Sequence, residues 1–237
     1  MTSAVVSVLT EEVYGGRRGA GYPRHPPAPV IHGTGAHVWP PPMWALVPWI
    51  TGKGGDGGGR GWETRAVIET ARLTLHTLSP ALLALLVAGD LDGARATDPP
   101  YDITAATFAD DDYVLRLRLA QLTADPTEQP WLYRVAVLKG TREVVGRAGF
   151  HARPDAVGMV EVGYSTAPAH RRQGYAVEMA SALLGWAGER GARQCLASVR
   201  PDNAASLGTI TKLGFVKVGE QVDEIDGLEW VHSLTLR

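Results

Sequence analysis

A short turn rich in positive charge, His-Arg-Arg-Gln-Gly-Tyr-Ala at residues 170–176, joins a predicted strand to a predicted helix. Residues 160–166 alternate as a strand does, and residues 177–190 carry apolar side chains at helical spacing. The first N–H groups of a helix have no partner within it, and the helix dipole favours negative charge there. Gly174 lets the backbone approach a ligand closely, while Arg171 and Arg172 suit phosphate oxygens. The segment therefore predicts a phosphate site at a helix N-terminus.

Two motifs in this chain resemble those of one enzyme superfamily. The spacing Arg171-x-x-Gly174-x-Ala176 resembles the coenzyme A signature of the GNAT superfamily, the acyl-CoA-dependent N-acyltransferases, although the fullest form of that signature has glycine at the last position. The segments Pro-Asp-Asn-Ala-Ala-Ser at 201–206 and Lys-Leu-Gly-Phe at 212–215 resemble the later half of the GNAT core. They are similar to the branch that includes the ribosomal-protein N-terminal acetyltransferases. The resemblance runs from about Glu69 to the C-terminus.

Glycine and proline divide the chain into two regions. Residues 1–62 contain 13 of the 28 glycines and 8 of the 16 prolines. Such a segment buries too little apolar surface to offset the entropy of ordering. We expect residues 1–62 to be a disordered extension, with residues 52–59 as a flexible linker and residues 63–237 as the N-acetyltransferase domain. The apolar stretch 43–50 could bind a partner protein. Alternatively, the whole extension could result from a start codon assigned upstream of the real one.

The composition bears on partners and on location. A formal charge of −2 gives no support for nucleic acid or an anionic membrane as the main partner, so neither is expected. No run of eighteen apolar residues predicts a membrane span. The one cysteine, Cys195, lies in an apolar strand pattern and suits a reducing cytoplasm, where we expect the protein to act as a monomer or homodimer.

The order of predicted elements favours an α/β fold with a mixed sheet and helices on both faces. Strands are expected at residues 71–76, 132–138, 143–151, 160–166, 193–199, 215–218 and 228–236. Helices are expected at residues 80–87, 112–124 and 177–190, with a short one after Asp202 or Asn203. The crossover from residue 160 to residue 199 is expected to be parallel and the earlier strands antiparallel. This order matches the GNAT fold, in which the parallel pair splays apart.

The resemblance implies where acetyl-CoA, the expected co-substrate, would bind. Its pantetheine arm would enter between the strands that end near residues 166 and 199. Main-chain contacts with the arm would come from Tyr164, Ser165 and Thr166, and Asn203 would hold the arm. The pyrophosphate would lie on the turn formed by Arg171, Arg172, Gln173, Gly174, Tyr175 and Ala176. The histidines show no metal-ligand spacing, so no metal is expected.

Acyl transfer from a thioester to an amine needs a neutral amine, a polarised carbonyl and a proton for the departing thiolate. Ser206, three residues after Asn203, resembles the family's Asn-x-x-Ser and would stabilise the thiolate, although either polar residue could serve only as a helix cap. Glu161 points to the face of its strand that carries Gly163 and is the candidate general base; a salt bridge is the alternative. Glu178 is expected on a solvated helix face and His170 in solvent.

The sequence therefore predicts an N-acetyltransferase that moves an acetyl group from acetyl-CoA to a primary amine, either a protein N-terminal α-amine or a small-molecule amine. One alternative is an antibiotic or polyamine acetyltransferase, in which acidic residues 220–226 attract a polycation rather than merely solvate a turn. Another is a catalytically silent CoA-binding regulatory domain.

Overall fold

The computed structural model describes residues 67–104, 106–108 and 111–236. The expectations for residues 1–62, including the linker and the apolar stretch, lie outside these residues. One eight-stranded sheet with the order β1-β2-β3-β4-β5-β6-β8-β7 organises the domain. Its strands are β1 (Ile68–Glu69), β2 (Leu73–Thr77), β3 (Arg134–Leu138), β4 (Val144–Phe150), β5 (Met159–Thr166), β6 (Gln194–Val199), β7 (Val216–Asp223) and β8 (Gly227–Thr235).

The pairing of the strands confirms the predicted mixed sheet. Neighbouring strands from β1 to β5 run antiparallel, and so do β6, β8 and β7. The pair β5 and β6 is parallel, because a helical crossover connects its two strands. This parallel pair lies near the middle of the sheet and joins its two antiparallel parts.

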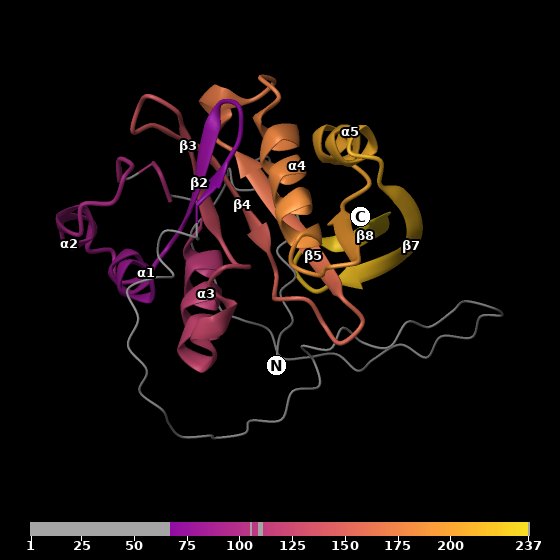
Figure 1. Cartoon of the computed structure of the whole chain (residues 1–237), viewed down its shortest axis with the longest axis horizontal. Helices are drawn as coiled ribbons and strands as arrows, with labels where there is room; N and C mark the ends of the chain where they lie inside the picture. The colour runs from indigo at the N-terminus through magenta and orange to yellow at the C-terminus, as the bar shows by residue number, and fades with distance from the viewer. Residues whose placement is uncertain (1–66, 105, 109–110, 237) are drawn as a thin grey trace, which may run out of the picture. The chain divides into compact units, whose positions relative to one another are not determined.

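Helices cover both faces of the sheet (Figure 1). On one face, α4 (Tyr175–Gly188) lies across β4 and β5, and α5 (Ala204–Lys212) lies beside it. On the other face, α1 (Pro80–Val87) and α3 (Asp112–Ala124) bury their apolar sides against β3. Short helices α2 (Leu91–Ala96), η4 (Pro126–Glu128) and η5 (Pro168–His170) lie in the connections. The burial of apolar side chains on both faces is the main stabilising term of such a fold.

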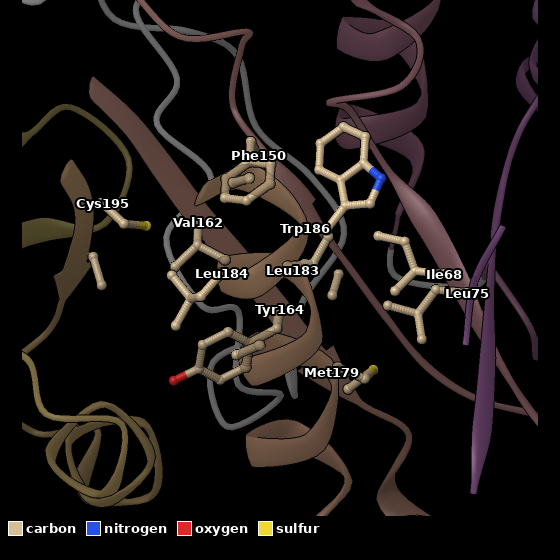
Figure 2. Close-up of a cluster of buried hydrophobic side chains, with 14 of the residues drawn as sticks. Ile68, Leu75, Phe150, Val162, Tyr164, Met179, Leu183, Leu184, Trp186 and Cys195 are labelled. Atoms are coloured by element: carbon tan, nitrogen blue, oxygen red, sulfur yellow. The ribbon is translucent and has the colours of Figure 1, made fainter. Parts of the chain in front are cut away.

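The larger apolar core lies beneath α4 and follows the helical spacing of the sequence. Met179, Ala180 and Leu183 are fully buried, and they pack on Val160, Val162 and Tyr164 of β5. Figure 2 shows the α4 side chains facing Phe150, Val162 and Tyr164, with Cys195 at the edge of the cluster. The expected buried faces of the motif helix and of the strand before it are confirmed.

The short elements β1 and α2 were not predicted, and β7 differs from its predicted range. The α2 helix has six residues, fewer than two helical turns, so its periodic signal is weak. It is held by the Asp90 carboxylate, which accepts from Gly93 N at 2.8 Å. The β7 strand runs to Asp223, well beyond the expected end at residue 218. A register shift between Lys217 and Gly219 breaks its alternation, so the second half of the strand reads as a polar loop.

A buried ionic cluster ties α3 to the sheet. The carboxylate of Asp111, the residue before α3, has no exposed surface and pairs with the guanidinium of Arg147 on β4. The Tyr133 hydroxyl donates to Asp111 Oδ2 at 2.5 Å. Burial, followed by the Asp111 charge, raises the pKa of the Tyr133 phenol, so this hydroxyl stays protonated and donates. A buried carboxylate needs such donors to offset its lost hydration.

The Tyr133→Phe substitution tests this cluster. We expect it to lower the free energy of unfolding by about 2 kcal/mol, because it removes one charge-assisted hydrogen bond from a buried carboxylate. Urea unfolding followed by circular dichroism measures the change. Tyr113→Phe is the control, since Tyr113 on the same helix is 45% exposed. Equal stability of the two variants would show that the Tyr133 hydroxyl adds nothing.

Candidate active site

The turn before α4 adopts a conformation that opens its backbone to a ligand. Gly174, the residue at the N-cap of α4, has φ +82°, and Arg172 has φ +62°. Such left-handed residues tighten the turn, and glycine adopts this conformation without strain. The N–H groups at the start of α4 have no partner within the helix. The turn thus leads directly into a helix start, with Tyr175 and Ala176 in the first turn of α4, and the anion site stays a prediction.

The two parallel strands separate before they end. The pairs between β5 and β6 are Met159 with Gln194, Val160 with Cys195, and Glu161 with Leu196. β5 then continues to Thr166 and β6 to Val199, and the described residues form no further pairs between these strands. On its other side, β5 stays paired with β4 as far as Thr166. Tyr164, Ser165 and Thr166 thus have no pairing partner on β6, and this unpaired stretch is the gap between β5 and β6.

Glu161 lies at the point where the strands part. Ser198 on β6 donates its hydroxyl to Glu161 Oε1 at 2.7 Å, and His151 Nδ1 lies 3.5 Å from Glu161 Oε2. Burial on its own would raise the pKa of Glu161, but the His151 charge and hydrogen bonds from His151 and Ser198 outweigh it. The net pKa lies below its ordinary value, so the side chain is a carboxylate at neutral pH.

A chain of polar groups extends from Glu161 across the sheet. Gln221 Nε2 donates to Ser198 Oγ at 3.2 Å and to Glu229 Oε2 at 3.0 Å. The Glu229 side chain is fully buried. Sequence reasoning missed His151, Ser198, Gln221 and Glu229, because their proximity depends on the register of four strands. The only sequence signal is a polar side chain at alternate positions of otherwise apolar strands.

The two predicted residues at α5 lie together beneath the helix start. Asn203 Oδ1 accepts from Ser206 N at 3.1 Å, so Asn203 is the helix cap. The Tyr164 hydroxyl donates to Ser206 O at 3.5 Å. Burial raises the pKa of the Tyr164 phenol, so it remains a donor at neutral pH. Figure 2 shows this hydroxyl directed towards α5, so the Tyr164 side chain links β5 to the start of that helix.

The arginines of the turn differ in their surroundings. Arg171 Nε donates to Thr166 O at 3.3 Å, which ties it to the end of β5. Arg172 occupies the left-handed position and is exposed. The Gln173 carbonyl accepts from Arg72 Nη1 at 3.0 Å. Both predicted cations are exposed, and they differ in that Arg171 is tied to the end of β5.

Two expectations about side chains near the turn are wrong. Glu178 is not on a solvated face: only 15% of its side chain is exposed, and it pairs with Arg72 at 2.7 Å. Burial opposes its ionisation, but hydrogen bonds from Thr70 and Arg72 and the Arg72 charge lower its pKa overall. His170 is not in solvent: its side chain is 18% exposed, lies 3.1 Å from Glu143 and packs edge-on against Tyr175. Both contacts join segments far apart in sequence, which local patterns do not reveal.

The part of the chain that the structure describes shows neither a metal-binding cluster nor a membrane-spanning helix. No group of three or more metal-ligating side chains is close enough there to hold a metal ion. None of the described helices has the length and apolar character needed to cross a membrane.

The comparison with protein families decides what kind of domain this is. A family model described as an acetyltransferase (GNAT) domain matches residues 72–216. The chain belongs to the GNAT acetyltransferase family. The matched range contains the turn before α4, the gap between β5 and β6, and the start of α5.

Individual relatives share either sequence or fold with this GNAT domain. An N-acetyltransferase named YjdG from Bacillus subtilis is 42% identical over 83 residues, which are 35% of this chain and 49% of that protein. The match thus spans about half of that relative. The solved RimL ribosomal L7/L12 α-N-protein acetyltransferase in complex with coenzyme A has a TM-score of 0.51 at 15% identity, covering 72% of this chain and 98% of that one. A spermidine N-acetyltransferase chimera from Vibrio cholerae and hSSAT has a TM-score of 0.50 at 15% identity, covering 70% and 96%.

The depressed pKa of Glu161 predicts a change in stability with pH. The Glu161 carboxyl binds a proton less tightly in the folded protein than in the unfolded chain. Its ionised form therefore stabilises the fold; this stabilisation is fully present above the ordinary pKa of 4.5 and is lost as the pH falls through the folded-state pKa. We expect Glu161→Gln to flatten the loss of stability below pH 4.5. Urea unfolding at a series of pH values measures this. Glu189→Gln, which removes a carboxylate that is 78% exposed, is the control and should leave the slope unchanged.

Proposed function

We propose that this protein is an N-acetyltransferase that takes an acetyl group from acetyl-CoA and transfers it to a primary amine. The observation that carries the proposal is the position of the gap relative to the turn. The gap between β5 and β6 opens after Glu161, and β5 then leads through η5 into the anion-binding turn at Gly174. A ligand with an amide-bearing arm and a pyrophosphate matches this order of unpaired strand edge and free helix N-terminus.

The residues present fit coenzyme A. Main-chain groups of Tyr164, Ser165 and Thr166 would hold the arm, and the N–H groups from Gln173 to Ala176 would hold the pyrophosphate, with Arg171 and Arg172 adding positive charge. Asn203 would keep the start of α5 next to the arm. The similar fold of RimL, which is described in complex with coenzyme A, supports this assignment. The co-substrate would supply an activated acetyl thioester.

The chain's own groups suit the two proton movements that the transfer needs. Ser206, with the protonated Tyr164 hydroxyl against it, would donate a hydrogen bond to the departing sulfur. Glu161 would take the proton of the incoming amine, directly or through a water, because it is ionised at neutral pH and next to the gap. His151 and Ser198 would hold the carboxylate in place.

A primary amine of a protein N-terminus or of a small molecule is the proposed acceptor. The polyamine alternative draws on the spermidine N-acetyltransferase chimera and on acidic residues 220–226. Within that hairpin, however, Asp223 Oδ1 accepts from Ile225 N at 2.7 Å and from Asp226 N at 2.9 Å, and Glu220 pairs with Lys217 at 2.6 Å. These acids already stabilise the hairpin, which favours the turn-forming role over attraction of a polycation.

Turnover of acetyl-CoA with a panel of amines tests the proposal and separates its alternatives. The panel holds peptides with free α-amines, polyamines and aminoglycosides, and release of free thiol reports the reaction. The protein's one cysteine, Cys195, is buried and should not add to that signal. Binding of acetyl-CoA without turnover of any amine would favour the silent regulatory domain.

The Gly174→Val substitution tests the position of the pyrophosphate. We expect it to weaken acetyl-CoA binding about tenfold or more, because a side chain with Cβ at φ > 0 costs about 1–2 kcal/mol and distorts the turn. Isothermal calorimetry measures the affinity. Gly140→Val is the matched control, since Gly140 has φ +80° in the hairpin between β3 and β4. Unchanged affinity in a folded Gly174→Val protein would place the pyrophosphate elsewhere.

Two substitutions test the proton path. We expect Ser206→Ala and Glu161→Gln each to lower turnover about a hundredfold with little change in acetyl-CoA affinity, as for a lost positioned proton transfer. Glu161→Gln should also remove the acid limb of the pH–rate profile. Thr211→Ala removes the hydroxyl of an exposed residue on the same helix as Ser206 and should have no effect. Wild-type turnover and pH dependence in both variants would assign the two residues a structural role only.

A further inference from the structure

Arg72 reaches from the connection between β1 and β2 to the turn before α4. Its Nη1 donates to the carbonyl of Gln173 at 3.0 Å. Its Nε donates to Glu178 Oε2 at 2.7 Å, and its backbone N donates to Glu178 Oε1 at 2.8 Å. Thr70 Oγ1 donates to the same Oε1 at 2.6 Å. Glu178 therefore fixes both the side chain and the backbone of this connection.

The Arg72 guanidinium also contacts the residues that follow Gln173. It lies over the ring of Tyr175 at 4.4 Å from the ring centre. A Cβ atom on Gly174 would lie 3.6 Å from Arg72 Nη2. Arg72 thus touches Gln173, Tyr175 and the space beside Gly174, although it precedes them by about a hundred residues.

The contact with the Gln173 carbonyl has a direct effect on the next N–H group. A trans peptide is planar, so its C=O and N–H bonds point in opposite directions. By holding the Gln173 oxygen, Arg72 fixes this peptide plane with the Gly174 N–H pointing away from the guanidinium. Arg172, the residue before Gln173, has φ +62°, a conformation that a non-glycine residue rarely adopts unless neighbouring contacts stabilise it.

We propose that Arg72 and Glu178 are positioning residues for the pyrophosphate of the proposed co-substrate. Glu178 holds Arg72, and Arg72 fixes the Gln173–Gly174 peptide so that the N–H groups of the turn face the ligand. Because Glu178 neutralises Arg72, the pair acts through the backbone of the turn rather than as a phosphate ligand. This inference rests on the proposed binding of acetyl-CoA and adds to it two residues outside the turn.

Two ligands distinguish positioning of the turn from general damage. Acetyl-CoA contains the pyrophosphate, whereas S-acetylpantetheine has the arm alone. We expect Arg72→Ala to weaken acetyl-CoA binding about tenfold while S-acetylpantetheine binding stays within about twofold of wild type, since only contacts made through the turn are lost. Calorimetry measures the first affinity and an NMR titration the second. Glu178→Gln, which keeps the shape of the side chain, should act in the same direction, and the double variant should lose less than the sum of the two.

Lys139→Ala is the matched control. Lys139 Nζ donates to Thr70 O at 2.6 Å and to Glu69 Oε2 at 3.2 Å, so it holds the same connection without touching the turn. It should leave both affinities unchanged. Equal weakening of both ligands by Arg72→Ala, or the same selective loss in Lys139→Ala, would overturn the inference. Normal acetyl-CoA binding by folded Arg72→Ala and Glu178→Gln proteins would overturn the positioning role but leave the proposed function intact. Absence of acetyl-CoA binding by the wild-type protein would overturn both.

Discussion

The end of the β5–β6 ladder at Glu161 and Leu196 is the constraint on which the rest of the site depends. Unpaired backbone groups away from water are unfavourable, so a sheet opens near its middle only where surrounding groups hold it open. Ser198 bridges to Glu161 at the fork, and the buried Tyr164 side chain fills the space between β5 and α5. These contacts tie both strands to their surroundings where the ladder ends.

The same fork links the proposed chemistry to the far edge of the sheet. From Ser198 the hydrogen bonds continue through Gln221 to Glu229. Gln221 on β7 and Glu229 on β8 are paired residues of these two strands. The carboxylate of Glu161 therefore belongs to a network whose members come from four strands. Such a network holds its members in one arrangement, because a buried polar group that loses a partner is costly.

Much of the fold could be predicted from sequence, because its signals are local. The apolar spacing of α4 and the alternation of β5 each act within a few residues, and the structure has both. The turn at Gly174 was also recognisable, since a left-handed position and a helix start need particular residues. The short helix α2 spans fewer than two helical turns, so its periodic signal is weak.

The parts of the site that sequence missed depend on contacts across the sheet. Glu178 reads as an exposed helix residue until Thr70 and Arg72, over a hundred residues earlier, are placed against it. His151 and Ser198 become neighbours of Glu161 only when the register of β4, β5 and β6 is known. Likewise, the role of Tyr164 changes once its hydroxyl is seen against α5, because a strand pattern gives the direction of a side chain but not its partner.

The tie between Arg72 and α4 also concerns one edge of the sheet. β1 and β2 form one edge, and β1 pairs only with β2 among the described strands. Edge elements open locally at lower free energy than central ones do. A ligand that binds the turn more tightly while Arg72 contacts it must, by linkage, also stabilise the state in which β1 and β2 stay paired. Slower amide exchange in β1 and β2 would then report cofactor occupancy from a site that the cofactor does not touch.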